Sequence, residues 1–270
     1  MSSQVRAAVP ATPAVSPEPV FYYVTGEWYK GNLPVFYDPA ELPGARILEE
    51  NFATIRDEVM AYFHAHGGEM KANFTPYAYR ERGWKTVNLF SYFFEYGDNC
   101  RKFPKTTEIV RRIPNVSMAQ VAVIDPHTRV KAHFGDTNVV IRMHLGLSVP
   151  GGLPELGLRA RRQRVTWQEG KVWAFNIAHR HYAWNATDRP RVALVVDVFR
   201  DEYVARRYAI AGNCLAAIAM KAFATRYPVT KRLPRWSLPW IHRPLGLVFR
   251  AALFAQRRLG VRAERVLRPS

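Results

Sequence analysis

The sequence is poor in cysteine and contains no long uncharged apolar run. Only Cys100 and Cys214 are cysteines among the 270 residues, and they lie far apart. Two such residues form neither a disulfide framework nor a zinc cluster, so we predict two buried thiols in a reducing, cytoplasmic compartment. An uncharged apolar stretch of about 18 residues would indicate a transmembrane helix, and the absence of one argues against it.

The N-terminus lacks the apolar segment of a signal peptide. Residues 1–20 are rich in Ser, Ala and Pro and contain one basic residue, Arg6. This composition predicts a disordered leader over residues 1–20. The chain as a whole is 48% hydrophobic and 13% aromatic, which predicts a folded core for the remainder.

Acidic residues are almost missing from the last quarter of the chain. Residues 203–270 contain 14 Lys/Arg and one acid, Glu264, whereas residues 1–202 contain 25 basic and 21 acidic residues. Most of the formal net charge of +17 therefore lies in this basic segment. No nucleic-acid-binding motif accompanies the charge, so we expect no nucleic-acid partner.

Short strand-like runs, most of them separated by proline or glycine turns, fill the middle of the chain. The predicted strands are Trp84–Tyr96 (one or two strands), Met118–Ile124, Val139–Val149, Leu158–Arg164, Lys171–Phe175 and Val192–Phe199. Helical spacing of apolar residues predicts helices over Leu48–His66, Lys105–Ile113, Glu202–Tyr227 and Leu245–Leu259. Successive strands without helices between them predict a mainly β fold with flanking helices, either a sandwich or a barrel-like jelly roll. We divide the chain into the disordered leader 1–20, a β domain 21–202 with N-terminal helices, and a basic helical extension 203–270.

Six short motifs between His133 and Val198 resemble the aspartyl/asparaginyl β-hydroxylase family of 2-oxoglutarate oxygenases. They are His133-x-Gly-x-Thr-Asn138, Arg142-Met-His-Leu-Gly-Leu147, Trp167-x-Glu-Gly-Lys171, His181-x-x-Trp184, Arg191 ten residues after His181, and Val196-Asp-Val198. The resemblance implies a double-stranded β-helix (jelly roll) and a hydroxylase that uses Fe(II), 2-oxoglutarate and O₂.

The resemblance also implies roles for five residues. His133 and His181 would bind iron, and imidazoles are common ligands of non-haem Fe(II). Arg142 and His144 would contact the metal-proximal carboxylate of the co-substrate, with a structural ion pair as the alternative for Arg142. Arg191 precedes a strongly apolar strand, where an arginine is costly unless it is paired, so the distal carboxylate is its expected partner.

Other polar landmarks receive structural interpretations. His179 competes with His181, since both lie on one face of an extended strand, and the spacing to Trp184 and Arg191 selects His181. Trp167 and Trp184 are expected in the core, Asn138 to bridge backbone groups, Asp197 to orient polar neighbours, and Gly170–Lys171 to form a tight turn. The remaining four histidines are expected to be hydrogen-bonded core or rim residues and not metal ligands; they are His64, His66, His127 and His242.

Gly135 occupies the position at which many enzymes of the superfamily carry an acidic iron ligand. This matches the hydroxylase family, whose vertebrate members are understood to bind iron through two histidines alone. Asp136, one residue later, is the alternative third ligand, and we do not include it in the predicted site.

The substrate residues of the vertebrate peptide hydroxylases do not match. Val140 replaces an arginine taken to hold the acidic side chain of the substrate, Ala122 replaces a serine, and Asn176 replaces an acidic residue. The resemblance therefore extends to the residues for iron and co-substrate but not to those for the substrate. Hydroxylation of an aspartyl or asparaginyl residue in a protein is thus placed in doubt.

The basic segment suggests a different partner. Arginines alternate with tryptophan and phenylalanine, which is typical of a helix in the interface of an anionic bilayer, and bacterial members of the family hydroxylate membrane lipids.

We predict a dioxygenase that acts on an amino-acid, peptidyl or lipid-linked substrate, cytoplasmic and peripheral on the inner face of the membrane. The alternatives are a helical appendage packed on the jelly roll and, for the whole chain, a non-catalytic jelly roll that binds a ligand or a membrane. The sequence specifies neither the substrate nor the oligomeric state.

Overall fold

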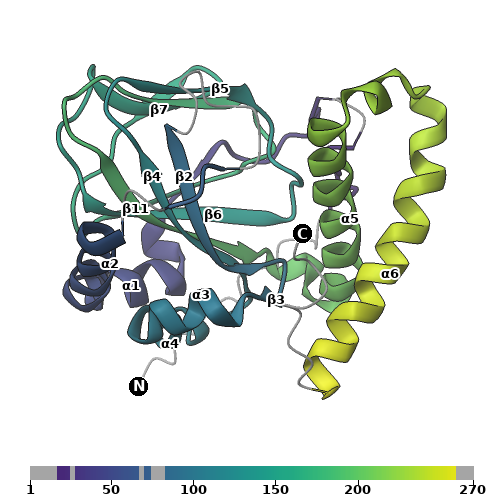
Figure 1. The fold of residues 1–270 in the computed structure, drawn as a ribbon, viewed down its shortest axis with the longest axis horizontal. Helices are drawn as coiled ribbons and strands as arrows, with labels where there is room; N and C mark the ends of the chain where they lie inside the picture. The colour runs from purple at the N-terminus through teal and green to yellow at the C-terminus, as the bar shows by residue number, and fades with distance from the viewer. Residues whose placement is uncertain (1–16, 25–27, 67–69, 74–82, 260–270) are drawn as a thin grey trace, which may run out of the picture.

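Two antiparallel β-sheets form the centre of the protein (Figure 1). The computed structural model describes residues 17–24, 28–66, 70–73 and 83–259. The large sheet has the strand order β1-β9-β6-β11-β4-β2-β3, and the small sheet has the order β5-β10-β7-β8. Their bounds are β1 Phe36–Tyr37, β2 Trp84–Ser91, β3 Phe94–Glu95, β4 Val116–Ile124, β5 Thr128–His133, β6 Val140–Ser148, β7 Leu156–Ala160, β8 Gln163–Val165, β9 Val172–Phe175, β10 His181–Asn185 and β11 Arg191–Phe199. From β4 to β11 the chain passes back and forth between the sheets, which is the predicted double-stranded β-helix.

The central strands of the large sheet are buried on both faces. Met143 and Leu145 of β6 belong to a core on the outer face, whereas Arg142 and His144 line a pocket on the inner face. Side chains alternate between the faces of a strand. Because both faces of these strands are buried, their sequences are largely apolar, and polar residues such as Arg142 and His144 interrupt them where the inner face lines the pocket.

Helices before β4 cover the outer face of the large sheet (Figure 1). They are α1 Pro43–Glu50, α2 Phe52–His66, α3 Gly97–Lys102 and α4 Pro104–Arg111, with the short 3-10 turn η1 Pro39–Glu41 before them. The predicted single helix Leu48–His66 is wrong in one respect, because the chain breaks at Asn51. The Asn51 side chain donates to the carbonyl of Ile47 and ends α1 there.

Two long helices stand side by side at one end of the jelly roll, with α5 nearer to the sheets and α6 on the outside (Figure 1). A 3-10 turn η3 Asp201–Arg206 leads into α5 Arg207–Arg226, and the turns η4 Pro228–Arg232 and η5 Arg235–Ser237 lead into α6 Leu238–Leu259. The last helix begins before the predicted Leu245 and contains Pro244. Proline removes the donor to the carbonyl of Trp240, and both residues are exposed, so water can bind that carbonyl.

By length and composition, Asp201–Arg226 is the one helix in the described part of the chain that is long and apolar enough to cross a membrane. Of its most apolar 18-residue window, 39% is buried against the rest of the protein. A buried core helix meets the same criterion, so the absence of a transmembrane helix stays a prediction.

The strand ranges differ from the sequence prediction at several places. β5 and β10 lie outside the predicted strand ranges, because they are short and carry charged or polar residues at their ends. The predicted strand Leu158–Arg164 is instead the hairpin of β7 and β8, and Arg161 has a φ of 50° at its turn. The predicted turn at Gly170–Lys171 is present, and Gly170 has a φ of 73°, which glycine adopts without strain.

Most of the leader and the end of the basic extension lie outside the described residues, namely 1–16 and 260–270. Residues 17–20 are described, and they contact the jelly roll. The Asn138 amide bridges backbone as predicted, since it accepts from Phe21 N at 2.9 Å and donates to Pro19 O at 3.1 Å. Cys100 and Cys214 are buried thiols, as predicted.

Candidate active site

His133 and His181 lie side by side because β5 and β10 are neighbours in the small sheet. The two residues are direct partners in the strand register. Their ring centroids are 4.3 Å apart, with an angle of 59° between the ring planes. The structure therefore brings the two predicted iron ligands together.

Backbone carbonyls hold both imidazoles in the same tautomer. Nδ1 of His133 bonds to the Lys131 carbonyl at 2.7 Å, and Nδ1 of His181 bonds to the His179 carbonyl at 2.8 Å. A carbonyl only accepts hydrogen bonds, so each Nδ1 carries the proton and each Nε2 carries the lone pair. This is the arrangement found in metal-binding histidines, in which a bond from the other ring nitrogen fixes the orientation of the ring.

Both rings are neutral at physiological pH. Burial lowers the pKa of His133 to about 4. Burial, together with the neighbouring His133, holds the pKa of His181 well below its usual range. Since only the neutral imidazole binds a metal, the environment keeps both residues in their metal-binding form.

No carboxylate completes this pair. Within the described ranges, no group of three or more His, Cys, Asp or Glu side chains is placed to hold a metal ion. Asp136, the alternative third ligand, instead accepts a hydrogen bond from Lys221 of α5 at 2.7 Å. The candidate site is a two-histidine site.

Gly135 stands where many related enzymes carry an acidic iron ligand, and the structure leaves no room there for a side chain. A Cβ at this position would lie 2.5 Å from Cγ1 of Ile177, while the backbone N–H of Gly135 donates to the Ile177 carbonyl at 2.7 Å. A side chain at Gly135 would require either Ile177 or the backbone of this segment to move.

We therefore expect Gly135→Asp to destabilise the protein without creating a third iron ligand. The expected loss is roughly 1–3 kcal/mol of unfolding free energy, as for overpacked cores, and no gain in Fe(II) affinity. Thermal unfolding and anaerobic Fe(II) titration measure the two effects. Gly152→Asp is the matched control, because a Cβ there meets Thr166 only at 3.8 Å. Tighter iron binding by a fully stable Gly135→Asp protein would contradict this prediction.

Arg191 is a buried cation with no carboxylate partner among the described residues. Its side chain is on the inner face of β11, and the residue is 2% exposed. Nη1 donates to the Ala122 carbonyl at 3.2 Å, and the guanidinium lies 4.3 Å from the Trp167 ring centroid. Nε has no hydrogen-bond partner among the described residues. Burial alone lowers the pKa of Arg191 to about 9, so the cation lacks a compensating anion.

His144 presents a second unpartnered donor to the same pocket. Trp167 Nε1–H donates to His144 Nδ1 at 3.2 Å, and an indole N–H is a donor only. The His144 proton is therefore on Nε2, which is buried and has no partner in the described part of the chain. The ring stacks on Trp173 with 4.4 Å between centroids. Burial, with Arg191 and Arg142 nearby, holds the pKa of His144 well below its usual range, so the ring is neutral.

Arg142 forms the structural ion pair that was the alternative in the sequence prediction. Its Nε and Nη2 donate to both carboxylate oxygens of Asp197, at 2.7 and 2.8 Å. Burial opposes the charge on Arg142, but Asp197 outweighs it and raises the pKa of the guanidinium. Asp197 orients Arg142, as its predicted structural role requires. Arg142 also lines the pocket, so a contact with the co-substrate stays a prediction.

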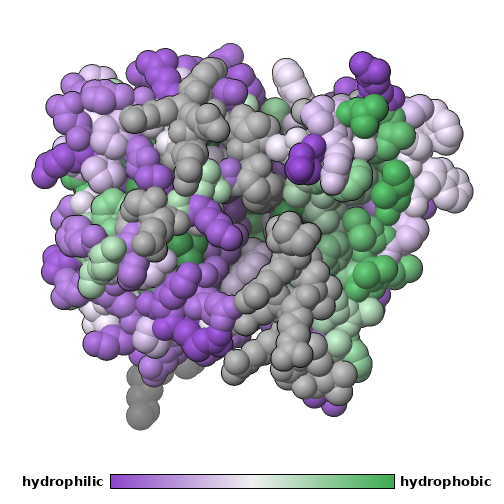
Figure 2. Space-filling view, viewed as in Figure 1, coloured by the Kyte–Doolittle hydropathy of each residue, from purple (hydrophilic) through white to green (hydrophobic). Residues whose placement is uncertain are grey.

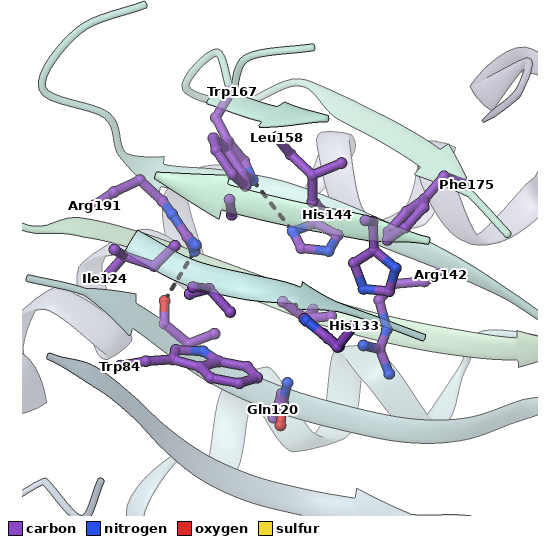
Figure 3. Close-up of a pocket in the computed structure, with 15 residues that line it drawn as sticks. Trp84, Gln120, Ile124, His133, Arg142, His144, Leu158, Trp167, Phe175 and Arg191 are labelled. Carbon is purple, nitrogen blue, oxygen red and sulfur yellow. Dashed lines mark hydrogen bonds between the residues drawn. The ribbon is translucent and has the colours of Figure 1, made fainter. Parts of the chain in front are cut away.

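All five predicted residues line one pocket between the two sheets (Figure 3). Trp84 and Gln120 line it from the large sheet, and Trp167 covers Arg191. These three were missed as site residues, because a tryptophan in a sequence reads as core and an isolated glutamine gives no signal. Apolar side chains form much of the remaining wall, including Ile124, Val130, Leu158, Phe175 and Ala183.

The other histidines have different settings. His179 bonds to the Leu33 carbonyl at 2.9 Å, which leaves the pocket to His181. His242 bonds to the Asn213 carbonyl, and His127 pairs with Asp188 at the surface. His64 and His66 are exposed at the end of α2.

The family model for aspartyl/asparaginyl β-hydroxylases matches residues 49–201, more than half of the chain. The chain belongs to the aspartyl/asparaginyl β-hydroxylase family. The match begins in α1 and ends just after β11, so it contains all five predicted site residues and excludes the basic helices.

Characterised members of this β-hydroxylase family differ in their named substrates. An ornithine lipid ester-linked acyl 2-hydroxylase from Rhizobium tropici is 35% identical over 176 residues, covering 62% of this chain and 60% of the relative. Human aspartyl/asparaginyl β-hydroxylase is 31% identical over 163 residues, covering 57% of this chain and 21% of the relative. The frog aspartate β-hydroxylase domain-containing protein 2 (Xenopus tropicalis) is 32% identical, covering 64% of this chain and 49% of the relative. The chain therefore spans at most about three fifths of the length of these relatives.

Solved structures with related folds are more distant. A viral collagen prolyl hydroxylase from Paramecium bursaria Chlorella virus-1, solved with 2-oxoglutarate, is 13% identical and has a TM-score of 0.35, covering 53% of this chain and 90% of that chain. A cupin domain of a transcriptional regulator from Enterobacter cloacae is 13% identical with a TM-score of 0.31, covering 44% of this chain and 98% of that chain.

Proposed function

We propose that this β-hydroxylase family member is an Fe(II)- and 2-oxoglutarate-dependent hydroxylase. The observation that carries the proposal is the pairing, in one pocket, of two neutral imidazoles with a buried arginine that lacks an anion. A non-catalytic jelly roll has no need for this combination, because an unneutralised buried cation costs stability.

The donor set of the pocket fits iron and 2-oxoglutarate. The Nε2 lone pairs of His133 and His181 would hold the metal, a role that imidazole commonly has for iron. The guanidinium of Arg191 suits the distal carboxylate of the co-substrate, because its planar fork binds a carboxylate through two bonds. The Nε2–H of His144 supplies a further donor for the end of the co-substrate nearer the metal. The bound iron and co-substrate would supply the oxidation, in which 2-oxoglutarate becomes succinate and CO₂ and a C–H bond gains an oxygen atom from O₂.

The protein itself would bind and orient the iron and the co-substrate, and it would exclude water from them. The carbonyls of Lys131 and His179 fix the ring planes of the two histidines, so the metal site is oriented before the metal binds. The Trp167 ring covers Arg191 and lowers the water content around it. In such a dry site, an electrostatic contact with a carboxylate is stronger than in water.

We further propose that the substrate is an acyl chain of a membrane lipid. The Rhizobium relative is named as an ornithine lipid acyl 2-hydroxylase, and the walls of this pocket are largely apolar. Among the described residues that line the pocket, no cation is left over for an acidic substrate side chain, because Arg142 is paired with Asp197 and Arg191 is assigned to the co-substrate. Val140, which replaces the substrate-binding arginine, is fully buried. A peptide or amino acid is the alternative substrate, and the cytoplasmic side of the membrane is the proposed location.

Aerobic incubation with Fe(II), 2-oxoglutarate and a membrane-lipid extract is expected to add one oxygen atom to a lipid acyl chain, with one succinate formed for each oxygen added. Mass spectrometry of intact and saponified lipids measures the product and places the hydroxyl group. His181→Ala is the control and should give neither product. If succinate formation instead rises only with amino acids or peptides, the lipid proposal is wrong while the oxygenase proposal stands. If the protein neither binds Fe(II) nor forms succinate, the oxygenase proposal is wrong.

A further inference from the structure

Helix α6 exposes a line of large apolar side chains along most of its length. Trp240, Leu247 and Phe254 recur every seven residues and are 78%, 65% and 62% exposed. Seven residues make almost two full turns, so these side chains lie on one face of the helix. A different side of the helix packs on α5, where Gly246 and Leu253 are buried. The exposed apolar side chains therefore do not contribute to the packing of α6 on α5.

A parallel line of arginines borders the apolar line. Arg243, Arg250 and Arg257 also recur every seven residues, each three residues after a member of the apolar line, and all three are exposed. Helix α6 contains no acidic residue. A large apolar face bordered by cations and free of acids is the composition of helices that lie in the interface of a membrane.

The turn between α5 and α6 continues the same composition. Trp236 and Val229 are 74% and 67% exposed, next to the exposed Arg232 and Arg235. Figure 2 shows apolar surface over the α5–α6 hairpin, in contrast to the largely hydrophilic surface of the jelly roll in the same view. Exposed apolar patches of this kind mark interaction sites, and tryptophan beside arginine is typical of the level of lipid headgroups.

We infer that the exposed face of α6 and the α5–α6 turn form a docking surface for an anionic lipid bilayer. The helix lies parallel to the membrane, with Trp240, Leu247 and Phe254 among the upper acyl chains and Arg243 and Arg250 at the phosphate level. The lack of acids makes the surface complementary in charge to anionic headgroups, and the apolar line supplies the part of the binding that salt does not screen.

The docking surface is connected to the candidate active site through α5. Lys221 of α5 bonds to Asp136, three residues after His133, and also lies 5.2 Å from the Tyr23 ring centroid. A membrane bound by α6 is thus held in a fixed orientation to the loop that follows an iron ligand. Delivery of an acyl chain to the pocket from that membrane rests on the proposed function, whereas membrane binding itself does not.

Vesicle flotation of the full-length protein, without iron or 2-oxoglutarate, tests the docking surface. Vesicles of phosphatidylcholine containing about one third phosphatidylglycerol should bind the protein, and pure phosphatidylcholine should bind it much more weakly. Each arginine near an anionic surface contributes about a fivefold change in partition, so Arg243→Glu/Arg250→Glu should weaken binding at least tenfold. Arg162→Glu/Arg164→Glu is the matched control, because it makes the same change in net charge on exposed residues of the β7–β8 hairpin and should have a much smaller effect.

The apolar line is tested separately. Leu247→Gln/Phe254→Gln should remove the binding that survives high salt, and an unchanged melting temperature is expected because both side chains are exposed. Brominated acyl chains should quench tryptophan fluorescence in the bound wild type. Trp236→Phe/Trp240→Phe should bind equally well and lose that quenching.

Three results would overturn the inference. One is equal binding by the α6 charge variant and its control. Another is a concentration-dependent dimer that Leu247→Gln/Phe254→Gln dissolves, which would show a second copy of the chain on this face. The third is a protein that resists extraction from membranes by high salt and alkaline carbonate, which would indicate a membrane-spanning α5. None of these results depends on enzymatic activity, so each is distinct from failure of the proposed oxygenase.

Discussion

His133→Ala and His181→Ala are each expected to abolish Fe(II) binding and 2-oxoglutarate turnover. The site offers only two protein ligands, and within the described residues no third His, Cys, Asp or Glu stands ready to replace one of them. Loss of an outer-shell partner already costs about 10–100-fold in metal affinity, and loss of one of two direct ligands should cost more. Anaerobic equilibrium dialysis with Fe(II) and a succinate assay measure the two effects.

His179→Ala is the matched control for the histidine variants. His179 is two residues from His181, but its ring bonds to the Leu33 carbonyl. Its backbone carbonyl, which orients His181, remains in the variant. We expect normal iron affinity per folded molecule, with circular dichroism used to measure the folded fraction. Retention of tight Fe(II) binding by either His133→Ala or His181→Ala would remove the metal assignment.

Arg191→Met is expected to raise the KM for 2-oxoglutarate by about 30-fold to more than 1,000-fold. Truncating one partner of a buried charge pair costs about 2–5 kcal/mol, which corresponds to that range. Arg191→Lys should recover part of the affinity, because lysine restores the charge without the two-bond fork. Steady-state succinate formation at varied 2-oxoglutarate measures this effect. An unchanged KM in Arg191→Met would place the co-substrate elsewhere.

The stability of the ligand-free protein should distinguish Arg191 from Arg142. Arg191 is buried without an anion, so Arg191→Met should not lower the melting temperature, although it should remove the rise that 2-oxoglutarate causes in the wild type. Arg142→Met leaves the buried Asp197 carboxylate unpaired and should cost about 3–5 kcal/mol of unfolding free energy. Equal destabilisation by both substitutions would mean that Arg191 is a structural cation.

The metal pair illustrates what a sequence can and cannot predict. His133 and His181 were predicted as ligands from motifs that resemble the hydroxylase family, yet neither segment was among the predicted strand ranges. β5 and β10 are short and end in polar residues, so their alternation gives a weak signal. Their contact comes from strand pairing across 48 positions of sequence, and pairing partners are set by the packing of the whole sheet.

The two arginines show the same division. The cost of burying Arg191 in an apolar strand predicted an anionic partner, and the structure places the residue in the pocket without a protein carboxylate. Arg142 and His144 are two positions apart in β6, which places them on one face of the strand, but a period of two specifies a face and not a partner. Asp197 lies directly opposite Arg142 in the register of β11 with β6, and this neighbour decides the ion pair.

The sequence by itself determined the mainly β fold and the concentration of positive charge in the last quarter of the chain, which follow from local composition and alternation. Its resemblance to the hydroxylase family added the jelly roll and the five polar residues that line the pocket, because the order of short motifs needs no knowledge of distant contacts. Tertiary structure decided the ion pair of Arg142, the role of Trp167 as the cover of Arg191, and the exposure of the apolar face of α6. Each of these depends on which surfaces meet in three dimensions, because burial and pairing are set by residues far away in the chain.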